Sequence, residues 1–184
     1  QPAKPQLIIT RGMSASGKST ISQPLVQQLG AVRIRSDVER KRLFGLKAED
    51  DGRAAVGKGI YSAEATRMTY RKLEELAAQI LDAGYSVIVD AVFLYYEERK
   101  QFRKLADAKQ TPFVILECIA DAETLRQRIV QRKKDISDAD LEVLEMQLSK
   151  WRPLHKDEHI NTITINTANP ADISVLVAQI KANK

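Results

Sequence analysis

The stretch Gly12-Met13-Ser14-Ala15-Ser16-Gly17-Lys18-Ser19-Thr20 decides the fold expected for this sequence of 184 residues. An apolar run from Leu7 to Thr10 precedes it and predicts a short β-strand. Apolar residues at helical spacing follow it and predict a helix from Ile21 to Leu29. A glycine-rich loop between a strand and a helix, ending in Lys-Ser, is typical of the Walker A loop (P-loop), whose backbone amides surround phosphate oxygens. The sequence therefore predicts a nucleotide-binding loop.

Each residue type in this loop has a role in holding a nucleoside triphosphate. Gly12 and Gly17 give the backbone the freedom to turn its amides inward, and the helix that follows presents its positive end to the phosphates. Lys18 brings a positive charge to the β- and γ-phosphates, and the Ser19 hydroxyl can coordinate Mg²⁺. The other residues expected to bind the nucleotide here are Ser14, Ala15, Ser16 and Thr20. We therefore expect ATP and Mg²⁺ as cofactors, with Lys18 as a catalytic residue.

The rest of the chain alternates short apolar runs with helical patterns. Strands are expected at residues 32–35, 87–90, 113–120 and 162–166, with helices in most of the intervening stretches. This alternation predicts one α/β domain over residues 7–184, with a mostly parallel sheet covered by helices on both faces. Ligands in such sheets bind beyond the carboxyl ends of the strands. The predicted site therefore lies at that edge.

Two carboxylates follow strands at this edge. Asp37 could accept a proton from an acceptor hydroxyl or hold a metal-bound water, or it could simply belong to the first turn of a helix. Arg40, one helical turn later, could bind the acceptor or pair with Asp37. Asp90 ends an apolar strand in the manner of a Walker B acid, so it could contact a metal-bound water or the acceptor. A structural salt bridge is the alternative for Asp90.

A cluster of cations follows the fourth predicted strand. Its members are Arg126, Arg128, Arg132, Lys133 and Lys134. Phosphoryl transfer needs cations that stabilise developing negative charge, and the forked guanidinium suits this role better than an ammonium. We expect Arg132 first and Arg128 second as catalytic residues, although a solvated helix face would explain the same pattern.

The composition of the chain says less about its function than these motifs do. The formal charge of +5 and the pI near 9.3 suit an anionic ligand, but an ordinary basic surface would give the same values. The one cysteine, Cys118, lies in an apolar run, so no disulfide framework is expected and a reducing cytoplasm fits. No apolar run approaches the roughly 20 residues that span a bilayer. Residues 1–6 resemble a linker, which suggests a domain excised from a longer protein.

The motifs, taken in order, resemble those of P-loop kinases such as polynucleotide 5′-kinase, gluconate kinase and the zeta toxins. The matching segments are Gly12 to Thr20, Ser36-Asp37 with Arg40, Val87 to Asp90, and Leu125 to Arg132, so the resemblance covers nearly the whole chain. It implies a nucleoside-kinase-like fold with a five-stranded sheet, an arginine-bearing lid near 127–137, and Asp37 as the base for the acceptor hydroxyl. It also implies that Arg128, Asn166 and Thr167 bind the nucleotide. The stretch from Tyr61 to Asp90 is similar to the predicted kinase domain often fused behind an aminoglycoside-phosphotransferase-like domain.

These observations predict an ATP- and Mg²⁺-dependent kinase acting on a hydroxyl group of a small molecule. A polynucleotide 5′-kinase is the first alternative; the basic charge favours it, but only 5% of the residues are aromatic and could stack on bases. A regulatory ATP-binding module of a larger protein is the second alternative. The phosphate acceptor itself stays open, because the stretch from Gly45 to Gly59 matches no substrate signature.

Overall fold

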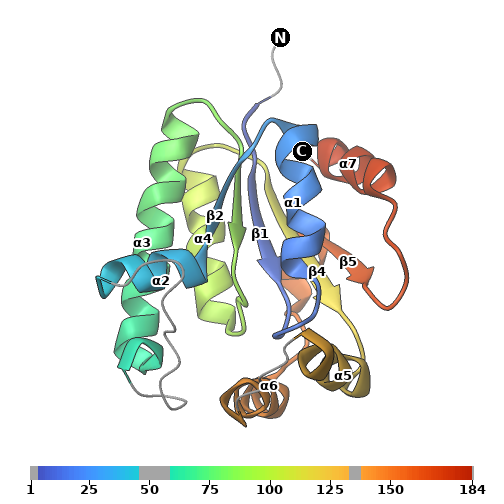
Figure 1. The fold of residues 1–184 in the computed structure, drawn as a ribbon. Helices are drawn as coiled ribbons and strands as arrows, with labels where there is room; N and C mark the ends of the chain where they lie inside the picture. Colours follow the sequence, from blue (N-terminus) through green and yellow to red (C-terminus); the bar gives the residue numbers. More distant parts are fainter. Residues whose placement is uncertain (1–3, 46–58, 133–137, 184) are drawn as a thin grey trace.

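The computed structural model describes residues 4–45, 59–132 and 138–183 of the chain (Figure 1). Three features expected from the sequence therefore lie partly outside the described residues. They are the first residues of the linker-like segment, most of the stretch from Gly45 to Gly59, and residues 133–137 of the expected lid.

Five strands form the central sheet, and they lie in the order β2-β3-β1-β4-β5. Every neighbouring pair is parallel. The strands are β1 (Leu7–Arg11), β2 (Val32–Arg35), β3 (Val87–Asp90), β4 (Phe113–Ile119) and β5 (Thr162–Asn166). This confirms the predicted α/β class and the five-stranded parallel sheet.

Helices cover both faces of the sheet and its carboxyl edge. Figure 1 shows α3 and α4 on one face and α1 and α7 on the other, with α5 and α6 beyond the ends of the strands. The α-helices are α1 (Lys18–Leu29), α2 (Ser36–Leu43), α3 (Ala63–Asp82), α4 (Tyr96–Ala108), α5 (Ala122–Arg132), α6 (Asp138–Lys150) and α7 (Ile173–Ala182). Two 3₁₀ turns, η1 (Gly59–Tyr61) and η2 (Lys156–Asn161), complete the described elements. None of the helices in the described part of the chain is long and apolar enough to cross a membrane.

The alternating side chains of β1 divide the core into two layers. Leu7 and Ile9 pack with α3 and α4, whereas Ile8 packs with α1 and α7. Because both faces are buried, β1 is apolar at successive positions instead of alternating between apolar and polar residues. This burial fixes the end of β1, and with it the start of the P-loop.

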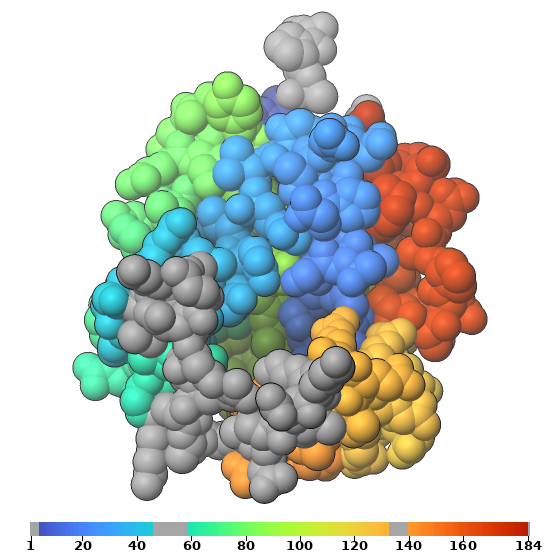
Figure 2. All heavy atoms as spheres, viewed as in Figure 1, coloured from blue at the N-terminus to red at the C-terminus, as the bar shows by residue number. Residues whose placement is uncertain are grey.

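A third, smaller apolar cluster joins α5 and α6 to the P-loop. Met13 of the loop is buried in it together with Leu125 and Ile129 of α5 and Leu144 of α6. Figure 2 shows, on one face of the molecule, α5 lying against the loop end of α1. The two helices beyond the sheet are therefore packed against the predicted nucleotide-binding loop.

Candidate functional site

The P-loop fits closely between β4 and its own helix. A Cβ atom added at Gly12 would lie 2.8 Å from the Cys118 backbone oxygen and 2.3 Å from Ser16 Oγ. Gly17 has φ of 90°, and a Cβ there would lie 3.3 Å from the Thr167 side chain. Side chains rarely tolerate either condition, so both positions require glycine. The two glycines thus allow the loop to wrap around the N-terminus of α1.

Lys18 lies where the P-loop becomes α1. Its Nζ donates a hydrogen bond to the Met13 backbone oxygen over 3.0 Å, which folds the side chain back along the loop. Burial lowers the pKa of Lys18 below its usual value, and Arg132 lowers it further, while Asp90 and Asp37 oppose the shift. Lys18 is thus a cation that senses the charges of Asp90, Arg132 and Asp37.

Ser19 and Asp90 make direct contact beside this lysine. The Ser19 hydroxyl donates to Asp90 Oδ2 over 2.9 Å, and the Ser22 hydroxyl donates to the same oxygen over 3.2 Å. Asp90 is only 5% exposed, and Arg33 of β2 lies 3.7 Å from it. These partners compensate the cost of burying a carboxylate. The alternative of a salt bridge for Asp90 has a counterpart in the 3.7 Å contact with Arg33, whereas contact with a metal-bound water or the acceptor stays a prediction.

These groups fit a magnesium–nucleotide complex chemically. Mg²⁺ prefers oxygen ligands and is often bound by one or two protein groups together with phosphate oxygens and water. The Ser19 hydroxyl and the Asp90 carboxylate are such groups, and the backbone amides at the start of α1 can bind phosphate. The buried Ser16 hydroxyl has no hydrogen-bond partner in the described residues, so the loop retains unused polar capacity.

The structure places Asp37 and Arg40 in different surroundings. Asp37, in the first turn of α2, is 58% exposed and lies 3.2 Å from Arg35. Arg40 is buried, and its NH1 donates to the Ile60 backbone oxygen over 2.7 Å and to Thr66 Oγ1 over 3.1 Å. Asp37 therefore pairs with a residue other than Arg40, and Arg40 connects α2 to the start of α3.

Arg128 connects the P-loop to the segment after β5. Its NH1 donates to the Ala15 backbone oxygen over 3.1 Å and to Thr167 Oγ1 over 3.0 Å, and its NH2 donates to the Thr167 backbone oxygen over 2.5 Å. The Thr167 hydroxyl in turn donates to the Ser16 backbone oxygen over 2.7 Å. The Asn166 side chain instead accepts from the Ala168 amide and closes a local turn. Arg128, Thr167 and the loop are thus brought together, with Asn166 adjacent.

Arg126 and Arg132, the other two arginines of the predicted cluster, have different surroundings. Arg132 is exposed at the last residue of α5 and acts on Lys18 electrostatically. Arg126 makes an exposed ion pair with Glu145 of α6, with Nε 2.6 Å from Oε1. Arg126 therefore links α5 to α6, whereas Arg132 is an exposed residue at the end of α5.

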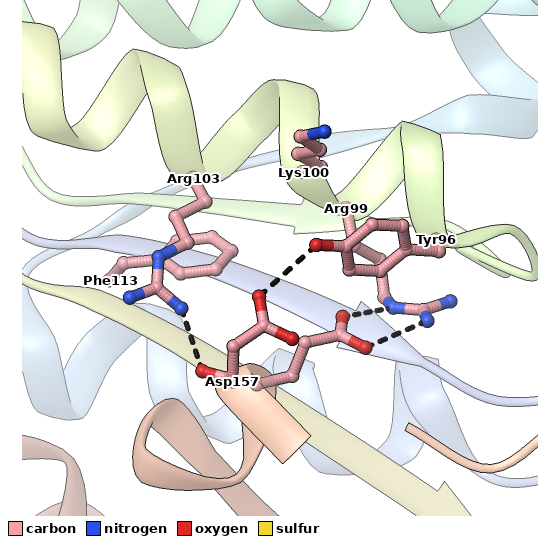
Figure 3. A pocket seen from close by; sticks show the side chains of 7 residues that line it. Tyr96, Arg99, Lys100, Arg103, Phe113 and Asp157 are labelled. Carbon is pink, nitrogen blue, oxygen red and sulfur yellow. Dashed lines mark hydrogen bonds and ion pairs between the residues drawn. The ribbon is translucent and has the colours of Figure 1, made fainter. Parts of the chain in front are cut away.

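A small hollow beside the N-terminus of α4 is separate from the P-loop (Figure 3). Its volume is about 10 Å³, enough for no more than one water molecule. Arg99 and Glu158, which line it, form a buried ion pair with Nε 2.6 Å from Oε1. Arg99 also donates to the backbone oxygens of Phe93 and Leu94. This pair fixes the segment after β3 and does not form a ligand site.

Sequence reasoning missed two residues that contact the site. Gln147 of α6 accepts a hydrogen bond from the Ser14 amide, and Arg33 donates to the Ser22 hydroxyl next to Asp90. Gln147 had a detectable signal, because it is a polar residue between Leu144 and Leu148 on the apolar side of its helix. Arg33 had none, because a charged residue in a short edge strand is ordinary.

A family model and curated relatives match most of this chain. The family model AAA_33, described as an AAA domain, matches residues 7–154. An uncharacterized protein of Mycobacterium tuberculosis strain H37Rv is 28% identical over 178 residues, which cover 95% of this chain and 34% of that protein. The chain thus spans about a third of the length of the curated relatives that it matches.

Solved structures of kinases share the fold over their full length. A candidate kinase of Chloroflexus aurantiacus is 24% identical with a TM-score of 0.71, covering 98% of this chain and 99% of that one. A gluconokinase of Sinorhizobium meliloti is 20% identical with a TM-score of 0.64, covering 97% and 90% of the two chains. The APS kinase of M. tuberculosis, solved with AMPPNP and APS, is 18% identical with a TM-score of 0.65, covering 97% and 96%. The resemblance to the P-loop kinase group is confirmed at the level of the fold.

Proposed function

Because this chain belongs to the AAA domain family, we propose that it is an ATP- and Mg²⁺-dependent phosphotransferase that moves the γ-phosphate of ATP to a hydroxyl group of a small molecule. One observation carries the proposal. Ser19 follows Lys18 directly in the first turn of α1. Its hydroxyl contacts the buried carboxylate of Asp90 at the end of β3. A hydroxyl, a carboxylate and an ammonium group in this arrangement suit a metal-bound triphosphate.

The P-loop residues would hold the nucleotide. Backbone amides at the start of α1 and the Lys18 ammonium would bind the phosphates, and Ser19 with Asp90 would hold the metal ion or its water ligands. Bound Mg²⁺ supplies positive charge that offsets the negative charge of the phosphates. Asn166, the last residue of β5, and Thr167, which follows it, would lie near the adenine.

Asp37 and the two arginines of α5 would complete the reaction. Asp37 is exposed, so an acceptor hydroxyl can approach it, and its carboxylate accepts the proton that the hydroxyl loses. Arg132 is exposed at the end of α5 and could stabilise negative charge on the transferred phosphoryl group, with Arg128 in a supporting position. Arg40, with Asp90, would shape the acceptor side of the site.

The cellular setting belongs to the same proposal. A buried free cysteine at Cys118, whose pKa burial raises to about 12, is an inert thiol that suits the reducing cytoplasm. The longer curated relatives suit a kinase domain that follows another, kinase-like domain in one chain.

A phosphorylation screen tests this function directly. Labelled ATP and Mg²⁺ are offered with sugars, nucleosides, aminoglycosides and 5′-hydroxyl oligonucleotides, and transfer to one small-molecule class is the expected result. Transfer only to oligonucleotides would replace the small-molecule acceptor with a nucleic acid. ATP binding without transfer to any acceptor would favour a regulatory module.

The Lys18→Ala variant is the matched control for the screen. The substitution removes the ammonium from the loop and leaves the apolar core intact, so the variant should fold and lose nucleotide binding or turnover severely. A folded variant with unchanged affinity and turnover would disprove nucleotide binding by this loop.

A further inference from the structure

Gln147 is a buried polar residue on an otherwise apolar side of α6. It is 6% exposed and lies one turn from Leu144, which is fully buried in the cluster with Met13. A buried amide needs a hydrogen-bond partner, because an unpaired one loses the free energy of hydration. The partner is the P-loop: Gln147 Oε1 accepts from the Ser14 backbone amide over 2.7 Å.

The C-terminal end of α6 is held against the residue that precedes the loop. Arg11, the last residue of β1, is 1% exposed and forms an ion pair with Glu117 of β4. Its guanidinium lies 3.9 Å from the centre of the Trp151 ring, and it donates to the Arg152 backbone oxygen. These contacts give α6 a fixed position on the sheet, so the Gln147 carboxamide is presented to the loop in one place.

The contact lies where the loop backbone turns. On one side of Ser14, the Gly12 amide donates to the Val92 backbone oxygen over 3.2 Å. On the other side, the Ser16 amide donates to the Met13 backbone oxygen over 3.1 Å, and Ala15 has φ of 63°, which residues other than glycine rarely adopt. Gln147 therefore satisfies the Ser14 amide next to the residue that carries the backbone strain.

We propose that Gln147 is a positioning residue of the nucleotide site, which holds the P-loop in its phosphate-binding conformation through the Ser14 amide before the nucleotide arrives. This rests on the proposed function, because the loop must bind phosphate for its preorganisation to matter. A preorganised loop binds its ligand more tightly, since the cost of ordering it is met during folding. Helix α6 thereby becomes part of the binding machinery without touching the nucleotide.

The test compares Gln147→Met with Gln147→Glu and a control, Glu142→Gln, at an exposed position of the same helix. Methionine keeps the length and the packing of the side chain but removes a good acceptor, whereas glutamate keeps an acceptor oxygen. The first measurement is hydrogen exchange of the Ser14 amide by NMR in the nucleotide-free protein. We expect fast exchange in Gln147→Met, and protection in wild type, Gln147→Glu and Glu142→Gln.

The second measurement is affinity for a non-hydrolysable ATP analogue in the presence of Mg²⁺. Leaving the Ser14 amide unpaired should weaken binding in Gln147→Met by about tenfold, whereas Glu142→Gln binds as wild type does. The thermal midpoint of each variant shows whether it is folded. If Gln147→Met does not fold, the protection of the Ser14 amide is compared between Gln147→Glu and wild type instead.

The outcomes separate this inference from the proposed function. Protection of Ser14 unchanged in Gln147→Met, or lost in a folded Gln147→Glu, would overturn the positioning role. Equal analogue affinity in Gln147→Met and wild type would overturn it as well. Failure of wild type itself to bind the analogue would instead refute the proposed function, while Ser14 exchange would still report on the hydrogen bond.

Discussion

Replacing Gly12 by alanine should damage the P-loop through crowding. The new methyl group would lie 2.3 Å from Ser16 Oγ, 2.8 Å from the Cys118 backbone oxygen and 3.2 Å from Lys18 Cγ. The Ser16 hydroxyl can rotate away, but the Cys118 carbonyl belongs to β4, which is paired on both sides in the sheet. The loop must therefore move.

The size of the effect follows from these distances. An ordinary contact begins near 3.4 Å, so the start of the loop must shift by 0.6 Å (3.4 − 2.8) from the Cys118 oxygen. Overpacking of this kind costs about 1–3 kcal/mol of stability. At roughly 2–4 °C per kcal/mol for a chain of this size, the thermal midpoint should fall by several degrees. Several amide–phosphate hydrogen bonds would be displaced together, so ATP affinity should fall by at least about tenfold.

Calorimetric titration with an ATP analogue and thermal unfolding measure the two effects. Gly30→Ala is the matched control, because a Cβ at Gly30 meets no atom within 4 Å and the residue lies at the other end of α1. Its φ of 58° makes alanine unfavourable there by about 1–2 kcal/mol. The control should lose stability but keep its ATP affinity. A Gly12→Ala variant with wild-type affinity and wild-type midpoint would refute the close packing of the loop on β4.

Three further predictions concern charged groups. Asp37→Asn should leave ATP affinity nearly unchanged and slow single-turnover transfer by about 10²- to 10⁴-fold, as loss of a general base does; a fast variant would exclude this role. Burial raises the pKa of Glu98 to about 7, so the folded state binds a proton between pH 4.5 and 7 that the unfolded state releases, and stability falls as pH rises through this window. Glu98→Gln keeps an acceptor for the Tyr95 amide and should remove this pH dependence. Urea unfolding at pH 5 and pH 8 should show a loss of about 2 kcal/mol of unfolding free energy in wild type and none in the variant. The same pH dependence in both proteins would show that Glu98 is not its cause. Arg99→Met leaves Glu158 as an unpaired buried charge and should cost about 3–5 kcal/mol, with partial recovery on adding Glu158→Gln; additive costs in a double-mutant cycle would argue against the ion pair.

Local pattern was sufficient to predict the fold. The segments 32–35, 87–90 and 162–166 became β2, β3 and β5 with the same bounds. The strand β3 is buried at every position and reads as a continuous apolar run, whereas the edge strands β2 and β5 are partly exposed and mix apolar with polar residues. The alternation of these strands with helices required right-handed crossovers and so a parallel sheet. The order of strands in the sheet was beyond this reasoning, since it depends on which faces pack together.

The centre of the site was also readable from sequence, because the P-loop is contiguous. Gly12, Gly17, Lys18 and Ser19 belong to one contiguous motif, and the strand before it and the helix after it fix the position of that motif. Asp90 could be placed at the same edge of the sheet as the loop, because the carboxyl ends of all parallel strands lie at one edge. Only the structure showed that its strand, β3, lies next to β1.

Only the tertiary structure decided which distant side chains support that loop. Gln147 is 133 residues from Ser14, and Thr167 is 151 residues from Ser16, yet each makes a hydrogen bond to the loop. No periodicity in sequence encodes such a pair, because its geometry depends on how α6 and β5 pack against the end of the sheet. The sequence by itself therefore determined the P-loop motif and its position at the end of β1. Packing determined which distant residues hold the loop in place, because hydrogen bonds between segments far apart in sequence need the folded chain.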